Sequence, residues 1–173
     1  MQDFSGKILY LDRSDINTDE IIPAKYLTEI TKEALKPHCL EDLKVNGFNA
    51  GRDIAGKRVI VSRANFGCGS SREHAVWALE VNGITAVVAE SFARIFRQNM
   101  FNCGLLAIEL PRTDIEAIFK TPSNDTVMEI DLSGRKLTVK NGSETKPFSF
   151  TLLDFDASLV DAGGWVEFAD KRY

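Results

Sequence analysis

Histidine and cysteine are scarce in this chain of 173 residues, which has two histidines and three cysteines. They are scattered along the sequence, at His38, Cys39, Cys68, His74 and Cys103. No pair of cysteines has the CxxC spacing of a zinc site, and an odd number of cysteines is not a disulfide framework. We therefore expect a protein of a reducing compartment that assembles no transition-metal site by itself.

The chain also lacks a long apolar run and a basic cluster. No hydrophobic segment approaches the roughly 20 residues that cross a bilayer, and the first six residues have no basic leader. Acidic residues number 25 and basic residues 21, so the formal net charge is −4, which is unfavourable for binding nucleic acid. These absences predict a cytoplasmic protein that binds neither a membrane nor a nucleic acid.

The composition supplies enough apolar material for one domain. Hydrophobic residues make up 44% of the chain, and a chain of this length buries about 70% of its unfolded surface without disulfides. Because there is no internal repeat or linker, residues 1–173 are expected to form a single domain. Residues 24–56 have the least regular pattern, and we expect a partly flexible loop region there.

Short apolar runs alternate with helical patterns in the middle of the chain. This alternation is typical of a parallel βαβαβ core that is covered on both faces, with additional antiparallel strands towards the end of the chain. The fold class is therefore α/β. Strands are expected at 7–11, 58–62, 84–89, 105–108, 127–132, 137–140 and 148–152, and helices at 31–35, 70–82, 91–102 and 156–162.

Helix starts are predicted from the spacing of capping boxes, in which two side chains satisfy each other's backbone N–H groups. Ser70 with Glu73, and Thr113 with Glu116, have this spacing. The second helix of the parallel core also carries large apolar residues at helical spacing, which predicts that they face the core. These residues are Phe92, Ile95, Phe96 and Met100.

The densest group of chemically useful residues, Asn65–Ala75, joins a predicted buried strand to a helix start. Its two glycines allow close backbone approach, and the N–H groups and dipole of a helix start attract anions. Arg72 can hold a carboxylate through two nitrogens, and Ser70 and Ser71 can donate to the same ligand. The segment predicts a site for a small anionic substrate, such as a dicarboxylate.

A serine hydroxyl at this position can also be a proton-abstracting group, because the helix end and Arg72 would stabilise its alkoxide. Either Ser70 or Ser71 fits that role. The other interpretation is a glycine turn with an ordinary cap and a solvated arginine. A dinucleotide site is excluded in detail, since GxGxxG requires glycine where Arg72 stands.

The acidic segment at 15–20 is a second candidate. Its functional interpretation is a carboxylate, Asp19, that orients an arginine or hydroxyl of the site, and the other is an Asx-rich turn. His74 is expected to be structural rather than catalytic. Cys68 lies between two glycines, and its position leaves open whether it is reactive.

Two segments together resemble the small-subunit family of 3-isopropylmalate dehydratases, which is similar to the swivelling domain of aconitase. They are Asp15–Pro23, followed by Tyr26 and Leu27, and the Asn65–Ala75 segment. The match covers about residues 4–165 in the family's order and spacing. The resemblance implies a swivelling β/β/α domain of the aconitase type. It also implies a hydro-lyase that interconverts 2- and 3-isopropylmalate by dehydration and rehydration in leucine biosynthesis.

The resemblance further implies a large-subunit partner, in a heterodimer or heterotetramer, that holds a [4Fe-4S] cluster, with no cofactor bound by this chain. Carried over by position, Ser70 matches the serine that takes the substrate proton as its alkoxide. Ser71 and Arg72 match the pair that binds a carboxylate of the alkylmalate substrate. Asp19 matches the aspartate that supports the site.

The resemblance also implies that the loop after Tyr26 and Leu27, within residues 24–56, discriminates between substrates. Homoaconitase-type small subunits have an arginine there for an extra carboxylate, whereas this chain has Thr28 followed by Glu29. An acidic residue repels a further carboxylate, so a branched apolar substituent is favoured. The alternatives are a dimethylmalate or methylmalate dehydratase, a homoaconitase, or a non-catalytic module that binds small anions.

Overall fold

One mixed sheet of seven strands forms the framework of the protein, in the order β4-β3-β2-β1-β5-β6-β7. The computed structural model describes residues 2–121 and 125–172; residues 1, 122–124 and 173 of the predicted domain lie outside the described part. The strands are β1 (Gly6–Tyr10), β2 (Lys57–Val61), β3 (Ala86–Ala89), β4 (Leu106–Glu109), β5 (Val127–Asp131), β6 (Lys136–Asn141) and β7 (Glu144–Ser149).

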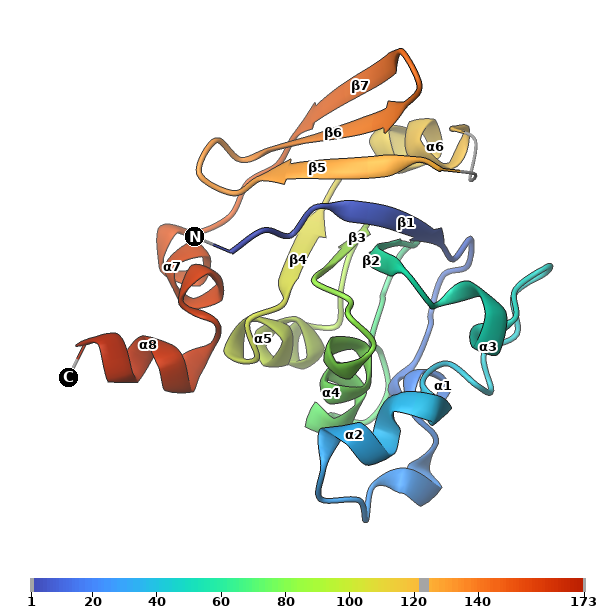
Figure 1. Cartoon of the computed structure of the whole chain (residues 1–173), viewed down its shortest axis with the longest axis vertical. Helices are drawn as coiled ribbons and strands as arrows, with labels where there is room; N and C mark the ends of the chain where they lie inside the picture. Colours follow the sequence, from blue (N-terminus) through green and yellow to red (C-terminus); the bar gives the residue numbers. More distant parts are fainter. Residues whose placement is uncertain (1, 122–124, 173) are drawn as a thin grey trace.

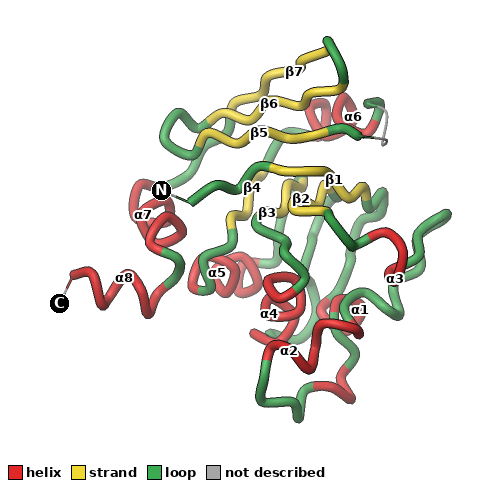
Figure 2. Tube along the Cα trace, in the orientation of Figure 1, coloured by secondary structure: helices red, strands yellow, loops and turns green. Residues whose placement is uncertain are grey.

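Helices precede, follow and connect these strands, as Figures 1 and 2 show. The α-helices are α1 (Thr18–Ile21), α2 (Lys32–Leu35), α3 (Ala50–Asp53), α4 (Glu73–Val81), α5 (Arg94–Asn102), α6 (Arg112–Phe119), α7 (Asp154–Ala162) and α8 (Trp165–Arg172). The segment 24–56 also contains two 3-10 turns, Ala24–Tyr26 before α2 and Lys36–His38 after it. The flexibility of this segment stays a prediction. None of the helices in the described ranges is long and apolar enough to span a bilayer.

The parallel half of the sheet consists of β1 to β4 and confirms the predicted βαβαβ core. All three pairings are parallel, with α4 connecting β2 to β3 and α5 connecting β3 to β4. All four residues of β3 are buried, as are the last three of β2 and the first three of β4. Side chains of a strand alternate between the two faces of a sheet, so both faces here are covered.

The antiparallel half, β5 to β7, attaches to the other edge of β1 (Figure 1). The prediction of three strands is confirmed, but the expected bounds of the last one, 148–152, are wrong. Asn141 pairs with Glu144, so a two-residue turn through Gly142 starts β7 at once. Gly142 has φ +59°, which the tight turn requires and glycine adopts without strain.

Both predicted capping boxes are wrong. Arg72 is the N-cap of α4 and Pro111 the N-cap of α6, and neither makes a side-chain cap bond. The Ser70 carbonyl accepts a hydrogen bond from outside the helix, and the N-cap of α4 lies two residues later than expected. In α6 the proline sets an earlier start, and the Glu116 side chain forms an ion pair with Arg63 instead.

The apolar stripe of α5 is buried only in part. Phe96 and Met100 are buried, as predicted. Phe92 is half-buried against the core, but it precedes α5, so its predicted place on the helix is wrong. Ile95 is 51% exposed, so its assignment to the core is wrong. It lies next to Phe96 along the helix, and consecutive helical positions point in different directions.

Candidate functional site

Two loops meet at the carboxyl ends of β1 and β2. Because these neighbouring strands are parallel, the segments that follow them leave the sheet at the same edge. The loops then continue side by side. The Gly67 N–H donates to the Ile16 carbonyl at 2.8 Å, and the Thr18 N–H donates to the Cys68 carbonyl at 2.9 Å. The two sequence segments that carry the predicted site residues thus lie side by side.

The two glycines of the second loop are required by its backbone. Gly67 has φ +81°, and a Cβ at this position would lie 2.2 Å from Cγ of Phe96 in α5. Gly69 has φ +94°, a left-handed conformation that other residues rarely adopt. Only glycine fits both the conformation and the close packing at Gly67.

Ser70 and Ser71 are exposed and lie just before the start of α4. The Ser70 carbonyl accepts from the Thr18 hydroxyl at 2.8 Å, which ties this turn to the first loop. The backbone of the turn is therefore fixed on the protein side, while the serine side chains face solvent. An exposed hydroxyl beside a helix N-terminus is in position to meet an anionic ligand.

Arg72 and Asp19 form an ion pair between the two loops, with Nη1 and Oδ1 3.3 Å apart. The arginine side chain is 21% exposed and the carboxylate 63% exposed. The same Oδ1 accepts from the Ala24 N–H at 2.9 Å, which orients the carboxylate. The structure thus brings together Ser70, Ser71, Arg72 and Asp19, as the sequence predicts.

Thr28 is exposed and lies in the turn that follows Ala24–Tyr26. The carbonyl oxygen of its neighbour Glu29 lies 2.9 Å from Nε2 of His74, in the first turn of α4. His74 also packs against the Trp77 ring, with centroids 4.6 Å apart. These contacts bring the turn with Thr28 next to the helix that follows Arg72, and they fit a structural role for His74.

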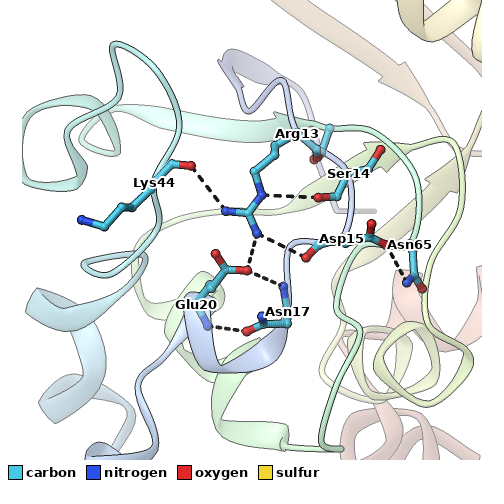
Figure 3. A network of polar contacts seen from close by, with 8 residues as sticks. Arg13, Ser14, Asp15, Asn17, Glu20, Lys44 and Asn65 are labelled. Carbon is cyan, nitrogen blue, oxygen red and sulfur yellow. Dashed lines mark hydrogen bonds and ion pairs between the residues drawn. The ribbon is translucent and has the colours of Figure 1, made fainter.

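Sequence reasoning missed a network centred on Arg13, which Figure 3 shows. Its guanidinium donates to the Glu20 carboxylate and to the carbonyls of Ser14 and Asp15. Glu20 in turn forms a capping box with Asn17, the N-cap of α1. The Asn-x-x-Glu spacing at 17–20 is the signal that identifies this helix start.

The Arg13 network favours the ionised form of Glu20. Burial alone would raise the pKa of this carboxyl, but hydrogen bonds from Arg13 and from the Asn17 N–H lower it below the usual range. The pKa of Arg13 is raised, mainly by its hydrogen bond to Glu20. The pair stabilises the short helix α1, which carries Asp19.

The cysteine between the two glycines is not activated by its surroundings. Burial, together with the negative charge of Asp15, raises the pKa of the Cys68 thiol above its usual value. Burial also raises the pKa of Cys39 and of Cys103 to about 12. Across residues 2–121 and 125–172, no group of three or more His, Cys, Asp or Glu side chains is placed to hold a metal ion.

A family model, sequence relatives and a solved structure all match this chain to the same family. The family model of the aconitase C-terminal domain matches residues 1–113. The 3-isopropylmalate dehydratase small subunit 2 of Deinococcus radiodurans is 41% identical over 157 residues, which are 90% of this chain and 71% of that protein. The small subunit of Thermodesulfovibrio yellowstonii is 42% identical over 161 residues, 91% of this chain and 89% of that protein.

A solved structure is similar over almost the whole fold. The crystal structure of 3-isopropylmalate dehydratase from Methanocaldococcus jannaschii superposes with a TM-score of 0.78 and 35% sequence identity. The match covers 99% of this chain and 95% of that chain, so the antiparallel half and the last helices are included.

Proposed function

Since the chain belongs to the aconitase C-terminal domain family, as a small subunit of 3-isopropylmalate dehydratase, we propose that its two loops complete the active site of that hydro-lyase. The family resemblance inferred from the sequence is thereby confirmed. In this proposal the enzyme interconverts 2- and 3-isopropylmalate by removing and restoring water. The observation that carries it is the meeting of Ser70, Arg72 and Asp19 at one sheet edge.

Ser70 is the proposed base, which takes the proton from the carbon adjacent to the one that bears the departing hydroxyl. Ser70 is exposed on the turn, and its backbone carbonyl accepts a hydrogen bond from the buried Thr18 hydroxyl. The N–H groups at the start of α4 and the nearby Arg72 favour negative charge at this point. These features support an alkoxide at Ser70 during the reaction.

Arg72 and Ser71 are the proposed binders of a substrate carboxylate. A guanidinium presents several N–H donors in a planar fork that matches a carboxylate. Asp19 contacts Nη1 and keeps the guanidinium beside the serines. A dianionic substrate is attracted to this cation, and Ser71 adds a hydroxyl donor at the same end of α4.

Thr28 and Glu29 are the proposed determinants of substrate choice. Both are exposed on the turn that His74 connects to α4. The Glu29 carboxylate disfavours an additional negative charge on the substrate, whereas a branched apolar substituent has no such penalty. This supports isopropylmalate over the longer tricarboxylate of a homoaconitase.

The residues of this chain do not fit an iron–sulfur cluster, because their thiols are dispersed and have raised pKa values. In the proposal the [4Fe-4S] cluster is held by the large subunit, where it supplies the Lewis acid that binds the substrate hydroxyl. The part played by this chain is to bind, orient and deprotonate the substrate.

The test is to express the chain with a large subunit of 3-isopropylmalate dehydratase from the same organism and to purify the complex under anaerobic conditions. Hydration of isopropylmaleate, followed by ultraviolet absorbance, is expected from the complex and not from either subunit alone. Light scattering on the same sample gives the stoichiometry. A stable chain that forms no complex and supports no turnover would leave an anion-binding module as the better explanation.

A panel of substrates on the same complex tests the specificity. Isopropylmalate is expected to have a higher kcat/KM than dimethylmalate, methylmalate or homocitrate. A preference for homocitrate would contradict the role given to Glu29, and Thr28→Arg is the matched variant expected to shift the preference towards homocitrate.

A further inference from the structure

Thr18 is a buried polar residue that makes two hydrogen bonds to the loop carrying the serines. It is the first residue of α1 and is 1% exposed. Its N–H donates to the Cys68 carbonyl at 2.9 Å, and its hydroxyl donates to the Ser70 carbonyl at 2.8 Å. One residue of the first loop thus holds two peptide groups of the second loop.

The two carbonyl groups that Thr18 binds lie on either side of Gly69, the residue of the turn with the greatest conformational freedom. The Cys68 carbonyl belongs to the peptide before Gly69, and the Ser70 carbonyl to the peptide after Ser70. Gly69 itself adopts φ +94°, and a Cβ there would lie 3.6 Å from the Thr18 hydroxyl. Because glycine has a wide choice of conformations, these bonds select one of them and so fix the direction in which Ser70 leaves the backbone.

The next residue of α1 orients the other key side chain. Asp19 contacts Arg72 at 3.3 Å, two positions after Ser70. The first turn of one short helix therefore places both the hydroxyl and the guanidinium. The capping box of Asn17 and Glu20, described above, fixes that turn in its own loop.

We infer that Thr18 is a positioning residue, whose hydroxyl sets the orientation of Ser70 through the Ser70 carbonyl. The inference rests on the proposed function, because it takes Ser70 as the base. Thr18 is buried beneath the turn and acts on the reaction only through the backbone of that turn. Small displacements of a reacting group lower the rate strongly, by about 100-fold for 1 Å.

Two substitutions separate the hydroxyl from the shape of the side chain. Thr18→Val keeps the volume and the backbone N–H but removes the donor, whereas Thr18→Ser keeps the donor. In the reconstituted complex, Thr18→Val is expected to lower kcat about 10- to 100-fold, while KM stays within about twofold of the parent value. Thr18→Ser is expected to retain kcat within about threefold.

Thr121→Val is the matched control. Thr121 is also buried, and its hydroxyl donates to the Ile118 carbonyl at 2.6 Å, in the loop after α6. It therefore reports the effect of removing a buried hydroxyl outside the two site loops. A Thr18→Val loss of kcat no larger than that of Thr121→Val, or an effect on KM alone, would overturn the inference.

Amide hydrogen exchange on the isolated chain gives a readout that needs no turnover. The N–H groups of Gly67 and Thr18, which donate across the two loops, are expected to exchange about 10-fold faster in Thr18→Val than in the parent, with no such change in Thr18→Ser or Thr121→Val. Unchanged exchange would refute the positioning role even if the complex were active. If exchange is faster in Thr18→Val but the parent complex has no turnover, Thr18 orders the turn as inferred and the proposed function is wrong.

Discussion

Arg72 and Asp19 face each other across two loops, with a guanidinium nitrogen 3.3 Å from a carboxylate oxygen and 53 positions between them in the sequence. The carboxylate is mostly exposed, so the pair contributes little to stability, about 0–1 kcal/mol. Its effect is on orientation, since it restricts the rotation of the guanidinium that is proposed to bind the substrate carboxylate.

Asp19→Asn tests that contact. The amide keeps an oxygen for the Ala24 N–H but loses the charge that attracts Arg72. We expect kcat/KM of the reconstituted enzyme to fall about 10- to 100-fold, with a free energy of unfolding within about 0.5 kcal/mol of the parent. Asp42→Asn, at an exposed position, is the control. Equal kinetics for the two variants would remove Asp19 from the site.

Ser70→Ala tests the base. The substitution removes the hydroxyl and keeps the carbonyl that Thr18 holds, so the turn should persist. Loss of a general base typically lowers kcat by about 10²–10⁴, and we expect a fall in that range with an unchanged urea midpoint. Ser143→Ala, in the exposed β6–β7 turn, is expected to leave kcat unchanged. Turnover near the parent level in Ser70→Ala would assign the base to another group.

Arg72→Lys tests the carboxylate contact. Lysine keeps the positive charge but not the planar fork, so it cannot hold a carboxylate through two nitrogens. We expect KM for isopropylmalate to rise about 10-fold or more and kcat/KM to fall further. Arg112→Lys, at the exposed start of α6, is the matched control. Parent-like KM in Arg72→Lys would indicate that charge alone suffices.

Glu20→Gln tests the network around Arg13. The pKa of Glu20 is lowered in the folded chain, so its carboxylate stabilises the fold above its usual pKa of 4.5. That contribution is lost as the pH falls below 4.5 through the folded-state pKa. We expect Glu20→Gln to lower the free energy of unfolding by about 1–2 kcal/mol at pH 7.

The difference between Glu20→Gln and the parent should shrink in urea titrations taken towards pH 3. Glu144→Gln, on the exposed edge strand β7, should show neither effect. A difference that grows on acidification would mean that Glu20 is not the group stabilised by folding.

Gly67→Ala tests the packing beneath the second loop. A methyl group there would require φ +81° and would collide with the Phe96 ring, so we expect a loss of about 3 kcal/mol in the free energy of unfolding. Gly47→Ala has almost the same φ, +79°, with no atom within 4 Å of the added methyl group, and should lose only about 1 kcal/mol. Similar losses in the two variants would show that Phe96 moves aside.

The core of the fold was predictable because its signals are local. The strands predicted at 58–62 and 84–89 are mostly apolar along their whole length and are separated by an amphipathic helix. This pattern is typical of a parallel sheet that is covered on both faces. Helix starts were harder to predict. Ser70 has the residue type of an N-cap, but its carbonyl is bound by Thr18, 52 positions away, and no local pattern contains that contact.

The residues of the proposed site could be inferred from the sequence, but the residues that support them could not. Ser70, Arg72 and Asp19 have chemistry that can be inferred from residue type, whereas Thr18 and Arg13 act through backbone carbonyls and a neighbouring carboxylate. Their roles depend on which loops the sheet places side by side. The last helix, α8, was missed because it has no buried residue, and Trp165 and Val166 are both more than half exposed.

The distance along the chain between Thr18 and Ser70 has a consequence for how the protein reaches its native state. A contact that closes a loop of 52 residues brings a large entropy cost and forms only after the elements that flank it have met. Those elements are β1 and β2, the neighbouring parallel strands that the two loops follow. We therefore expect the geometry of the proposed site to form late in folding and to be lost when those two strands separate.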